Sequence, residues 1–128
     1  MTTTNYYQTF MAVADDCPVE HAEIPPSKEP KSAARIQYEM LIDKPYVYTS
    51  DDVLYAANGE RKGISREAFF SKGQACFRAS PLPKRYGWGV HFDHEGRMAI
   101  YARESDEYQR FVQDESLKQL KAMRSKRG

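Results

Sequence analysis

The chain has 128 residues and a mass of 14.8 kDa, a length that predicts one domain. Hydrophobic residues make up 41% and charged residues 29% of it, as in folded globular domains, and no apolar run approaches the ~20 residues that a bilayer span needs. Disordered, collagen-like, coiled-coil and membrane-spanning classes are therefore excluded for the bulk of the chain, and we expect no membrane partner.

The formal net charge of +1 predicts no partner, but the charge is unevenly distributed. Residues 1–64 carry a net charge of −4 and residues 65–128 a net charge of +5. The basic residues from Lys118 to Arg127 have no acidic residue after Glu115. This asymmetry permits attraction of a polyanion, although a solvated helix end whose cations suit the helix dipole explains it more simply.

The N-terminus lacks the basic start and the apolar stretch of a secretory signal. Cys17 and Cys76 are the only cysteines, too few for a disulfide framework or a four-thiolate zinc site. A reducing, cytoplasmic location is therefore expected. A single Cys17–Cys76 disulfide stays open, because separation in sequence says nothing about distance in space.

The first half of the chain predicts one strand followed by three helices. Residues 6–14 are aromatic and apolar and predict a strand that ends before Pro18, and the four prolines of residues 18–31 predict an extended surface loop. Helices are predicted over residues 32–43, from Ser50 as N-cap to a stop at Asn58-Gly59, and over residues 66–71 with Ser65 as N-cap.

The second half is predicted to be mostly sheet. Residues 75–80 suggest a short strand, followed by an extended turn at Pro81-Leu82-Pro83. Residues 87–92 and 97–103 alternate in polarity around Asp93–Gly96, which suits a type I turn. We therefore expect a hairpin whose buried face carries Trp88, Val90, Phe92 and Ile100.

After the hairpin, Ser105 is expected to cap a helix that breaks near Asp114, because its two apolar stripes lie about 120° apart on one helix surface. A separate helix is expected over residues 115–124, followed by a frayed basic tail at residues 125–128. Together the elements predict a single α+β domain over residues 1–128. Its sheet should be antiparallel with four or five strands, and its helices should cover mainly one face, because helices and strands are segregated along the chain.

The densest group of charged, aromatic and small residues lies between positions 78 and 91. Prolines stiffen the loop that carries its cations, and Gly87 and Gly89 leave space at one strand face. Cations beside flat rings can hold a phosphate, a carboxylate or a nucleobase. We therefore expect an anionic small molecule or nucleic acid to bind through Arg78, Lys84, Arg85, Tyr86, Trp88 and His91. In the competing interpretation, Trp88 anchors the core and the glycines make room for a crossing helix.

Other chemistry has weaker support. His91, Asp93 and His94 are close in sequence, but a metal would need a further ligand such as His21, Glu23 or Cys17, and no spacing demands one. Cys76 could pair with His91 only if the fold brought the two into contact. No catalytic residue, metal or cofactor is therefore predicted.

Two further functional classes stay open beside anion binding. One is an enzyme or metabolite-binding protein with its site on the His91 face of the hairpin over residues 87–103. The other is a structural or protein-interaction role, and the nine tyrosines scattered along the chain are compatible with a homo-oligomer interface.

Several segments are long enough to carry a specific family resemblance: Asn5–Phe10, Ala12–Pro18, Ile36–Glu39, Tyr48–Leu54, Phe69–Gln74, Ala79–Gly89 and Leu117–Arg127. Together they resemble a family of small bacterial proteins known only as a domain of unknown function, over nearly the whole chain. The stretch around Asn58-Gly59 is shorter than in other members. The resemblance implies a bacterial, cytoplasmic protein and no catalytic residue.

Overall fold

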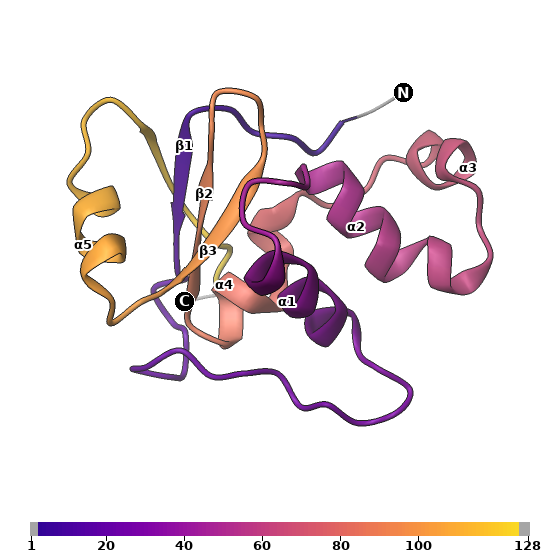
Figure 1. The fold of residues 1–128 in the computed structure, drawn as a ribbon, viewed down its shortest axis with the longest axis horizontal. Coiled ribbons are helices and arrows are strands. Elements are labelled where there is room, and N and C mark those ends of the chain that lie inside the picture. The colour runs from indigo at the N-terminus through magenta and orange to yellow at the C-terminus, as the bar shows by residue number, and fades with distance from the viewer. Residues whose placement is uncertain (1–2, 126–128) are drawn as a thin grey trace.

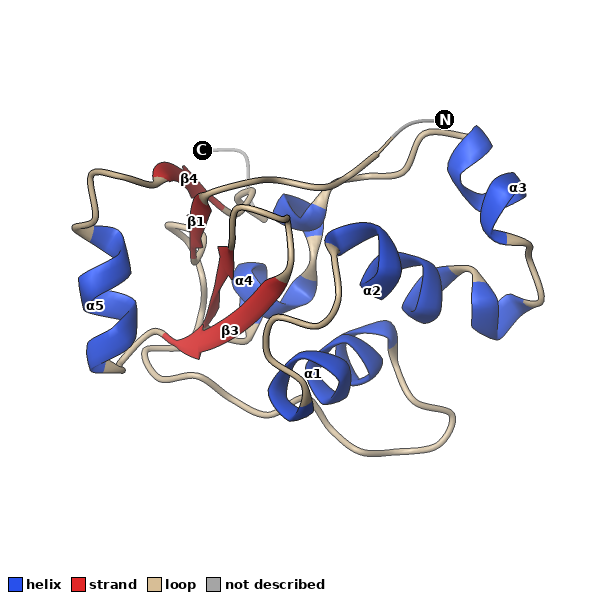
Figure 2. Cartoon of the chain, turned by 45° about the horizontal axis from the view of Figure 1, so that its top comes forward, coloured by secondary structure: helices blue, strands red, loops and turns tan. Residues whose placement is uncertain are grey.

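The computed structural model describes residues 3–125 and places one sheet between two helical layers (Figures 1 and 2). The strands are β1 (Thr9–Ala12), β2 (Trp88–Phe92), β3 (Met98–Ala102) and β4 (Lys118–Lys121). One layer holds α1 (Ala33–Asp43), α2 (Ser50–Asn58), α3 (Arg66–Ser71) and α4 (Pro81–Arg85), with the 3-10 helices η1 (Glu60–Lys62) and η2 (Phe77–Ala79). The other layer is α5 (Asp106–Val112). The predicted α+β class, with the helices mainly on one face, is confirmed.

The sheet is mixed rather than antiparallel, which corrects the prediction. Its strand order is β3-β2-β1-β4, and the β3/β2 and β2/β1 pairs are antiparallel. β4 runs parallel to β1, from Thr9 opposite Lys118 to Ala12 opposite Lys121. Between β3 and β4 the chain passes through α5 over one face of the sheet to the far edge (Figure 1), and this crossover lets β4 run in the same direction as β3 and β1.

The predicted hairpin is confirmed, with β2 and β3 as its strands. The Asp93 carboxylate accepts hydrogen bonds from the backbone N–H groups of Glu95 and Arg97, each at 2.9 Å. Gly96 has a φ of +81°, which a glycine adopts without strain. The four side chains predicted for the buried face are each 9% exposed or less: Trp88, Val90, Phe92 and Ile100.

The predicted strand over residues 75–80 and the extended turn at residues 81–83 are wrong, because the chain forms η2 and α4 there. The Ser80 hydroxyl accepts a hydrogen bond from the N–H of Leu82 and so caps α4. Pro81 occupies the first turn, where a helix leaves its N–H groups unpaired and proline loses nothing. The serine and the proline therefore start a helix here rather than prevent one.

The predicted helix over residues 115–124 is also wrong, although the break near Asp114 is real: α5 ends at Val112. The segment instead forms β4, with Lys118 N–H donating to Gln8 O and Ala122 N–H donating to Ala12 O, each at 2.9 Å. The open edge of β1 supplies these partners, and local periodicity cannot reveal them. Of the predicted basic tail, residues 126–128 lie outside the described residues.

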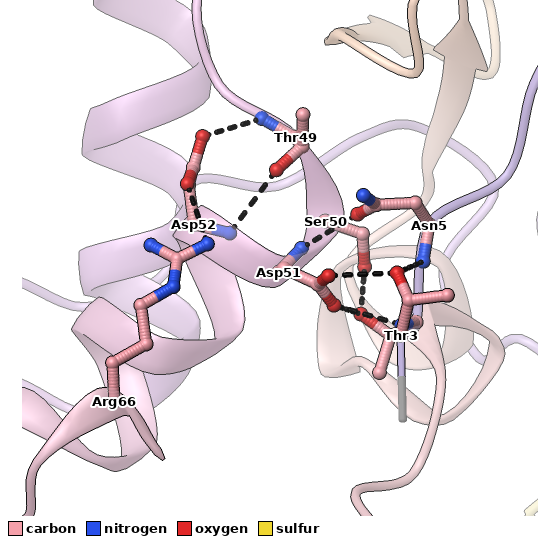
Figure 3. Close-up of polar contacts among 8 residues, drawn as sticks. Thr3, Asn5, Thr49, Ser50, Asp51, Asp52 and Arg66 are labelled. Atoms are coloured by element: carbon pink, nitrogen blue, oxygen red, sulfur yellow. Dashed lines mark hydrogen bonds and ion pairs between the residues drawn. The ribbon is translucent and has the colours of Figure 1, made fainter. Parts of the chain in front are cut away.

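The expected N-cap of α2 shifts by one residue, from Ser50 to Thr49, which forms a capping box with Asp52. Ser50 and Asp51 instead hold the N-terminal segment (Figure 3). The buried Asp51 carboxylate accepts from the backbone N–H and the hydroxyl of Thr4, each at 2.7 Å, and from the Thr3 hydroxyl at 2.7 Å. Residues 3 and 4 are thereby held to α2, because one carboxylate of that helix accepts several hydrogen bonds from them.

Residues 18–31 contain no helix or strand, yet they are fastened across the end of the sheet. Arg103 donates to the carbonyl of Val19 at 2.6 Å, and the carboxylate of Glu104 accepts from the N–H of Ala22 at 2.9 Å. Glu23 N–H donates to Tyr86 O at 2.8 Å. The segment is therefore a surface loop held by the ends of β2 and β3.

The core is divided by the sheet, since side chains alternate between its faces. Met11, Val90 and Phe92 belong to the larger cluster beneath the helices, whereas Phe10 packs with Tyr108 on the α5 side. A Cβ atom at Gly89 would lie 2.5 Å from a ring carbon of Tyr108 and 2.7 Å from one of Phe10. Gly89 thus makes room for α5, as the competing interpretation of the glycines anticipated.

Replacing Gly89 with alanine is therefore expected to lower the free energy of unfolding by about 1–3 kcal/mol through overpacking. Urea denaturation followed by circular dichroism measures this loss. The double variant Gly89→Ala, Tyr108→Leu relieves the overlap with the Tyr108 ring, so its loss should be less than the sum of the two single losses. Strictly additive losses would contradict the packing argument.

Candidate functional site

The six residues predicted to bind an anion are divided between the two faces of the sheet. Trp88 lies among the helices, and its indole Nε1–H donates to Glu23 O at 2.8 Å. Tyr86 packs against the same core cluster. His91 lies three positions from Trp88 on β2 and therefore points to the α5 face. Trp88 and His91 accordingly do not line a common cavity.

Of the three predicted cations, Arg78 and Arg85 lie near the C-terminal segment. Arg78 Nε donates to the carbonyl of Lys121 at 2.7 Å, and Lys84 and Arg85 end α4. Acidic groups share this surface: Asp15 pairs with Lys121 at 2.9 Å, and Asp16 lines a hollow together with Arg85. The mixed charge gives the expected binding of an anion or nucleic acid here no support.

On the α5 face, three polar rings form a continuous hydrogen-bonded chain. The Tyr46 hydroxyl lies 2.7 Å from His91 Nδ1 and 2.8 Å from the Tyr101 hydroxyl. His91 also stacks on Phe111, with ring centroids 4.3 Å apart, and Phe111 packs against Tyr101 at 5.0 Å. These hydrogen bonds therefore link the imidazole to Tyr101 along one aromatic surface.

Tyr46 reaches this face from the outer edge of β3. The Tyr46 N–H donates to Met98 O at 2.8 Å, and Met98 N–H donates to Tyr48 O at 2.9 Å. The backbone is therefore hydrogen-bonded to β3 at Tyr46 and again two residues later. Tyr46 has a φ of +60°, in the left-handed region that costs a non-glycine residue free energy. Such strain persists only where the surrounding structure holds it, and here it places the hydroxyl between His91 and Tyr101.

Beside the Tyr101 end of this chain lies a cleft of about 290 Å³, lined by Tyr101, Glu107, Arg110, Phe111 and Asp114. Four of these residues come from α5 and the turn after it, at spacings of three and four that put them on one helix face. Within the described part of the chain, Glu107 and Arg110 have no ion-pair partner. The cleft thus combines an aromatic wall with one cation and two carboxylates.

Burial determines the charge state of the hydrogen-bonded chain. Burial lowers the pKa of His91 below its ordinary value, against the opposing effect of the Asp93 and Asp114 carboxylates. Burial and the hydroxyl of Tyr101 raise the pKa of Tyr46. Hydrogen bonds from Ser116 lower the pKa of Asp114, which therefore stays ionised. Near neutral pH the hydrogen-bonded chain accordingly holds an uncharged imidazole next to the protonated phenol of Tyr46.

Of this site, the sequence indicated only His91. Tyr46 carries no local signal, since it reaches His91 from 45 residues away over the sheet edge. The spacing of Glu107, Arg110, Phe111 and Asp114 marks one face of a helix, but many solvated helices share such a pattern. Only the position of α5 over the sheet joins that face to the tyrosines.

Within residues 3–125, no three His, Cys, Asp or Glu side chains are grouped so that they could hold a metal ion. Cys17 and Cys76 are both free thiols, and Cys76 lies on the helix side of the sheet, away from His91. No helix of the described chain is long and apolar enough to cross a membrane.

Comparison with known proteins gives one match. The model of a family of unknown function (DUF6157) matches residues 1–128, the whole chain. No curated protein and no solved structure is similar enough to match. The expected resemblance to a domain of unknown function is thereby confirmed.

Proposed function

The chain belongs to this family of unknown function over its full length, so we propose a function from the geometry of the site alone. In this proposal the cleft beside α5 binds a small zwitterionic molecule, and Tyr101 exchanges a proton with that molecule. The observation that carries the proposal is the Tyr101–Tyr46–His91 chain, which ends at that cleft. The proposal develops the expected class of metabolite-binding protein or enzyme on the His91 face.

The charges that line the cleft favour a zwitterion over a simple anion. The Arg110 guanidinium can hold a carboxylate, while the carboxylates of Glu107 and Asp114 attract an ammonium group. A ligand with only a negative charge would meet a net charge of −1 from these three groups. Tyr101 and Phe111 provide an apolar wall for the body of the ligand.

The hydrogen-bonded chain supports proton exchange because each hydroxyl can both accept and donate. As a ligand proton reaches the Tyr101 oxygen, the Tyr101 proton passes to Tyr46 and the Tyr46 proton to Nδ1 of His91. The ligand loses one proton and the imidazole gains it, so charge is conserved. An uncharged histidine within hydrogen-bond reach is suited to such a general base role.

Binding is tested by saturation-transfer NMR with a panel of free amino acids, each beside its analogue lacking the amine and its analogue lacking the carboxylate. We expect amino acids to bind better than either analogue, and Arg110→Gln to weaken binding about ten- to hundredfold through loss of a charge-assisted hydrogen bond. Arg97→Gln removes an exposed arginine just before β3, at the end of the strand away from Tyr101. It is the matched control and should bind as the unmodified protein does. Equal effects of the two variants would contradict the proposal.

The proton chain is tested separately through His91, which does not line the cleft. In the unmodified protein, ligand binding should shift the ring resonances of His91. Tyr46→Phe keeps the aromatic ring but removes the connecting hydroxyl, so the ligand should still bind while the His91 shift disappears. A His91 shift that persists in this variant would show that the hydroxyl chain does not carry the coupling.

A further inference from the structure

A second cleft, of about 270 Å³, lies on the opposite side of the sheet, between the helices and the segment before α4. Its polar lining consists of Gln37, Asn58, Gln74, Cys76 and Ser80, and Leu54 and Phe69 are among its apolar walls. The described residues that line it include no acidic, basic or histidine side chain. Because an ion buried without a counter-charge is costly, this cleft suits an uncharged ligand.

Gln37 points to the group that such a ligand must carry. Its side chain is 1% exposed, and its Oε1 accepts from the Ser80 hydroxyl at 2.6 Å. The Ser80 oxygen in turn accepts from Leu82 N–H, which orients the hydroxyl and hence the amide. Among the described residues, Gln37 Nε2 has no hydrogen-bond partner. No side-chain N or O atom of the described residues is both buried and unpartnered, so this N–H group must be reached by solvent and is available to an acceptor in the cleft.

Gln74 provides the complementary acceptor. Its Nε2 donates to Phe69 O at 2.7 Å, which leaves its amide oxygen as the group that can receive a hydrogen bond. Asn58, at the end of α2, adds a second amide to the same lining. The cleft therefore presents an amide donor at Gln37 and an amide acceptor at Gln74 between apolar walls.

From this lining we infer that the cleft binds a small uncharged molecule carrying a carboxamide or lactam group. The ligand carbonyl accepts from Gln37 Nε2, and its N–H is offered to the amide oxygens of Gln74 or Asn58. The ligand body packs against Leu54 and Phe69. This inference is independent of the proposed function, because the two clefts lie on opposite sides of the sheet and share no residue.

The thiol of Cys76 lines this cleft and reports on it directly. Iodoacetamide is itself a small uncharged carboxamide, whereas iodoacetate has nearly the same size and a negative charge. In both reactions the cysteine sulfur displaces iodide from the CH₂ carbon, an S–C bond forms, and the thiol proton goes to solvent. Cys17 packs on the α5 side of the sheet and serves as the internal reference in the same molecule.

The rates of alkylation at both cysteines are measured by peptide mass spectrometry. We expect the preference for iodoacetamide over iodoacetate to be about two- to tenfold larger at Cys76 than at Cys17, the range that one or two neutral hydrogen bonds provide. Benzamide should slow alkylation of Cys76 in a saturable manner, and benzoate, its charged counterpart, should not. Neither compound should protect Cys17.

Two variants connect this preference to Gln37. Gln37→Leu removes the donor and should bring the reagent preference of Cys76 down to that of Cys17. Gln37→Glu keeps an oxygen for the Ser80 hydroxyl and replaces the Nε2 donor by a second oxygen, so it should abolish the protection of Cys76 by benzamide, which carries no charge, even if the leucine variant fails to fold. Gln109→Leu, on the exposed side of α5, is the matched control and should change nothing.

Equal reagent preferences at the two cysteines, together with no protection by benzamide, would overturn the inference. Better protection by benzoate would also overturn it, since the cleft would then select anions. Binding of free amino acids at the α5 cleft is measured by a different signal. Absence of that binding would not change the alkylation results expected at Cys76.

Discussion

Replacing Trp88 with alanine is expected to lower the free energy of unfolding by about 3–5 kcal/mol, the range for emptying a large aromatic site. The Trp88 ring is 9% exposed and packs against Tyr38, with ring centroids 5.5 Å apart. Its Nε1–H also donates to the carbonyl of Glu23, which fastens the loop over residues 18–31 to β2. The variant therefore loses core packing and a loop contact together.

Urea denaturation followed by far-UV circular dichroism measures the loss, since the variant lacks the only tryptophan and with it the fluorescence signal. Trp88→Phe is the graded control: it keeps most of the aromatic packing and removes the hydrogen bond to Glu23, so its loss should be smaller. A midpoint of Trp88→Ala equal to that of the unmodified protein would refute the core role of this residue.

The second large effect is expected at Asp51. Asp51→Ala should lower the free energy of unfolding by about 2–4 kcal/mol, because it leaves two buried donors of Thr4 without their acceptor. Thr4 is 4% exposed and Asp51 is 6% exposed, so water reaches neither group easily. Since the carboxylate holds the N-terminal segment, residues 3–5 should also lose their protection from amide hydrogen exchange.

Asp52→Ala is the matched control for Asp51, with the same loss of charge one residue along α2. Asp52 belongs to the capping box and pairs with Arg66 at 3.0 Å, but its side chain is 33% exposed. A cap and an exposed ion pair together contribute less, so the expected loss is about 1–2 kcal/mol. If Asp52→Ala proves as destabilising as Asp51→Ala, or leaves residues 3–5 equally unprotected, the anchoring role of Asp51 is wrong.

The elements predicted correctly are those whose determinants lie within a few residues. Ser32, Ser65 and Ser105 each accept a hydrogen bond from an N–H three residues further on, which begins α1, α3 and α5. The hairpin follows from alternation and from the carboxylate of Asp93. The determinants of the start of α4 are equally local, since Ser80 and Pro81 form an N-terminal helix signal. The prolines of the same segment also suit a turn, and the prediction of a turn there is wrong.

The candidate site shows the opposite case. The sequence points to His91, but its proposed neighbour Trp88 lies on the other face of the sheet, because residues close in a strand alternate between faces. Its actual partner, Tyr46, comes from another part of the chain and lies in a backbone conformation that sequence does not indicate. Convergence from distant segments therefore had to be seen in the structure.

The sequence by itself determined the α+β class, the hairpin with its buried face and the helix starts, because hydrophobic alternation and capping act between near neighbours. The tertiary structure decided that residues 118–121 form a strand, since the partners of that strand are the free backbone groups of β1. It also decided which side of the sheet each cleft faces. Apolar spacing in residues 115–124 is compatible with helix or strand, and only the open edge of β1, with N–H and C=O groups to satisfy, selects between them.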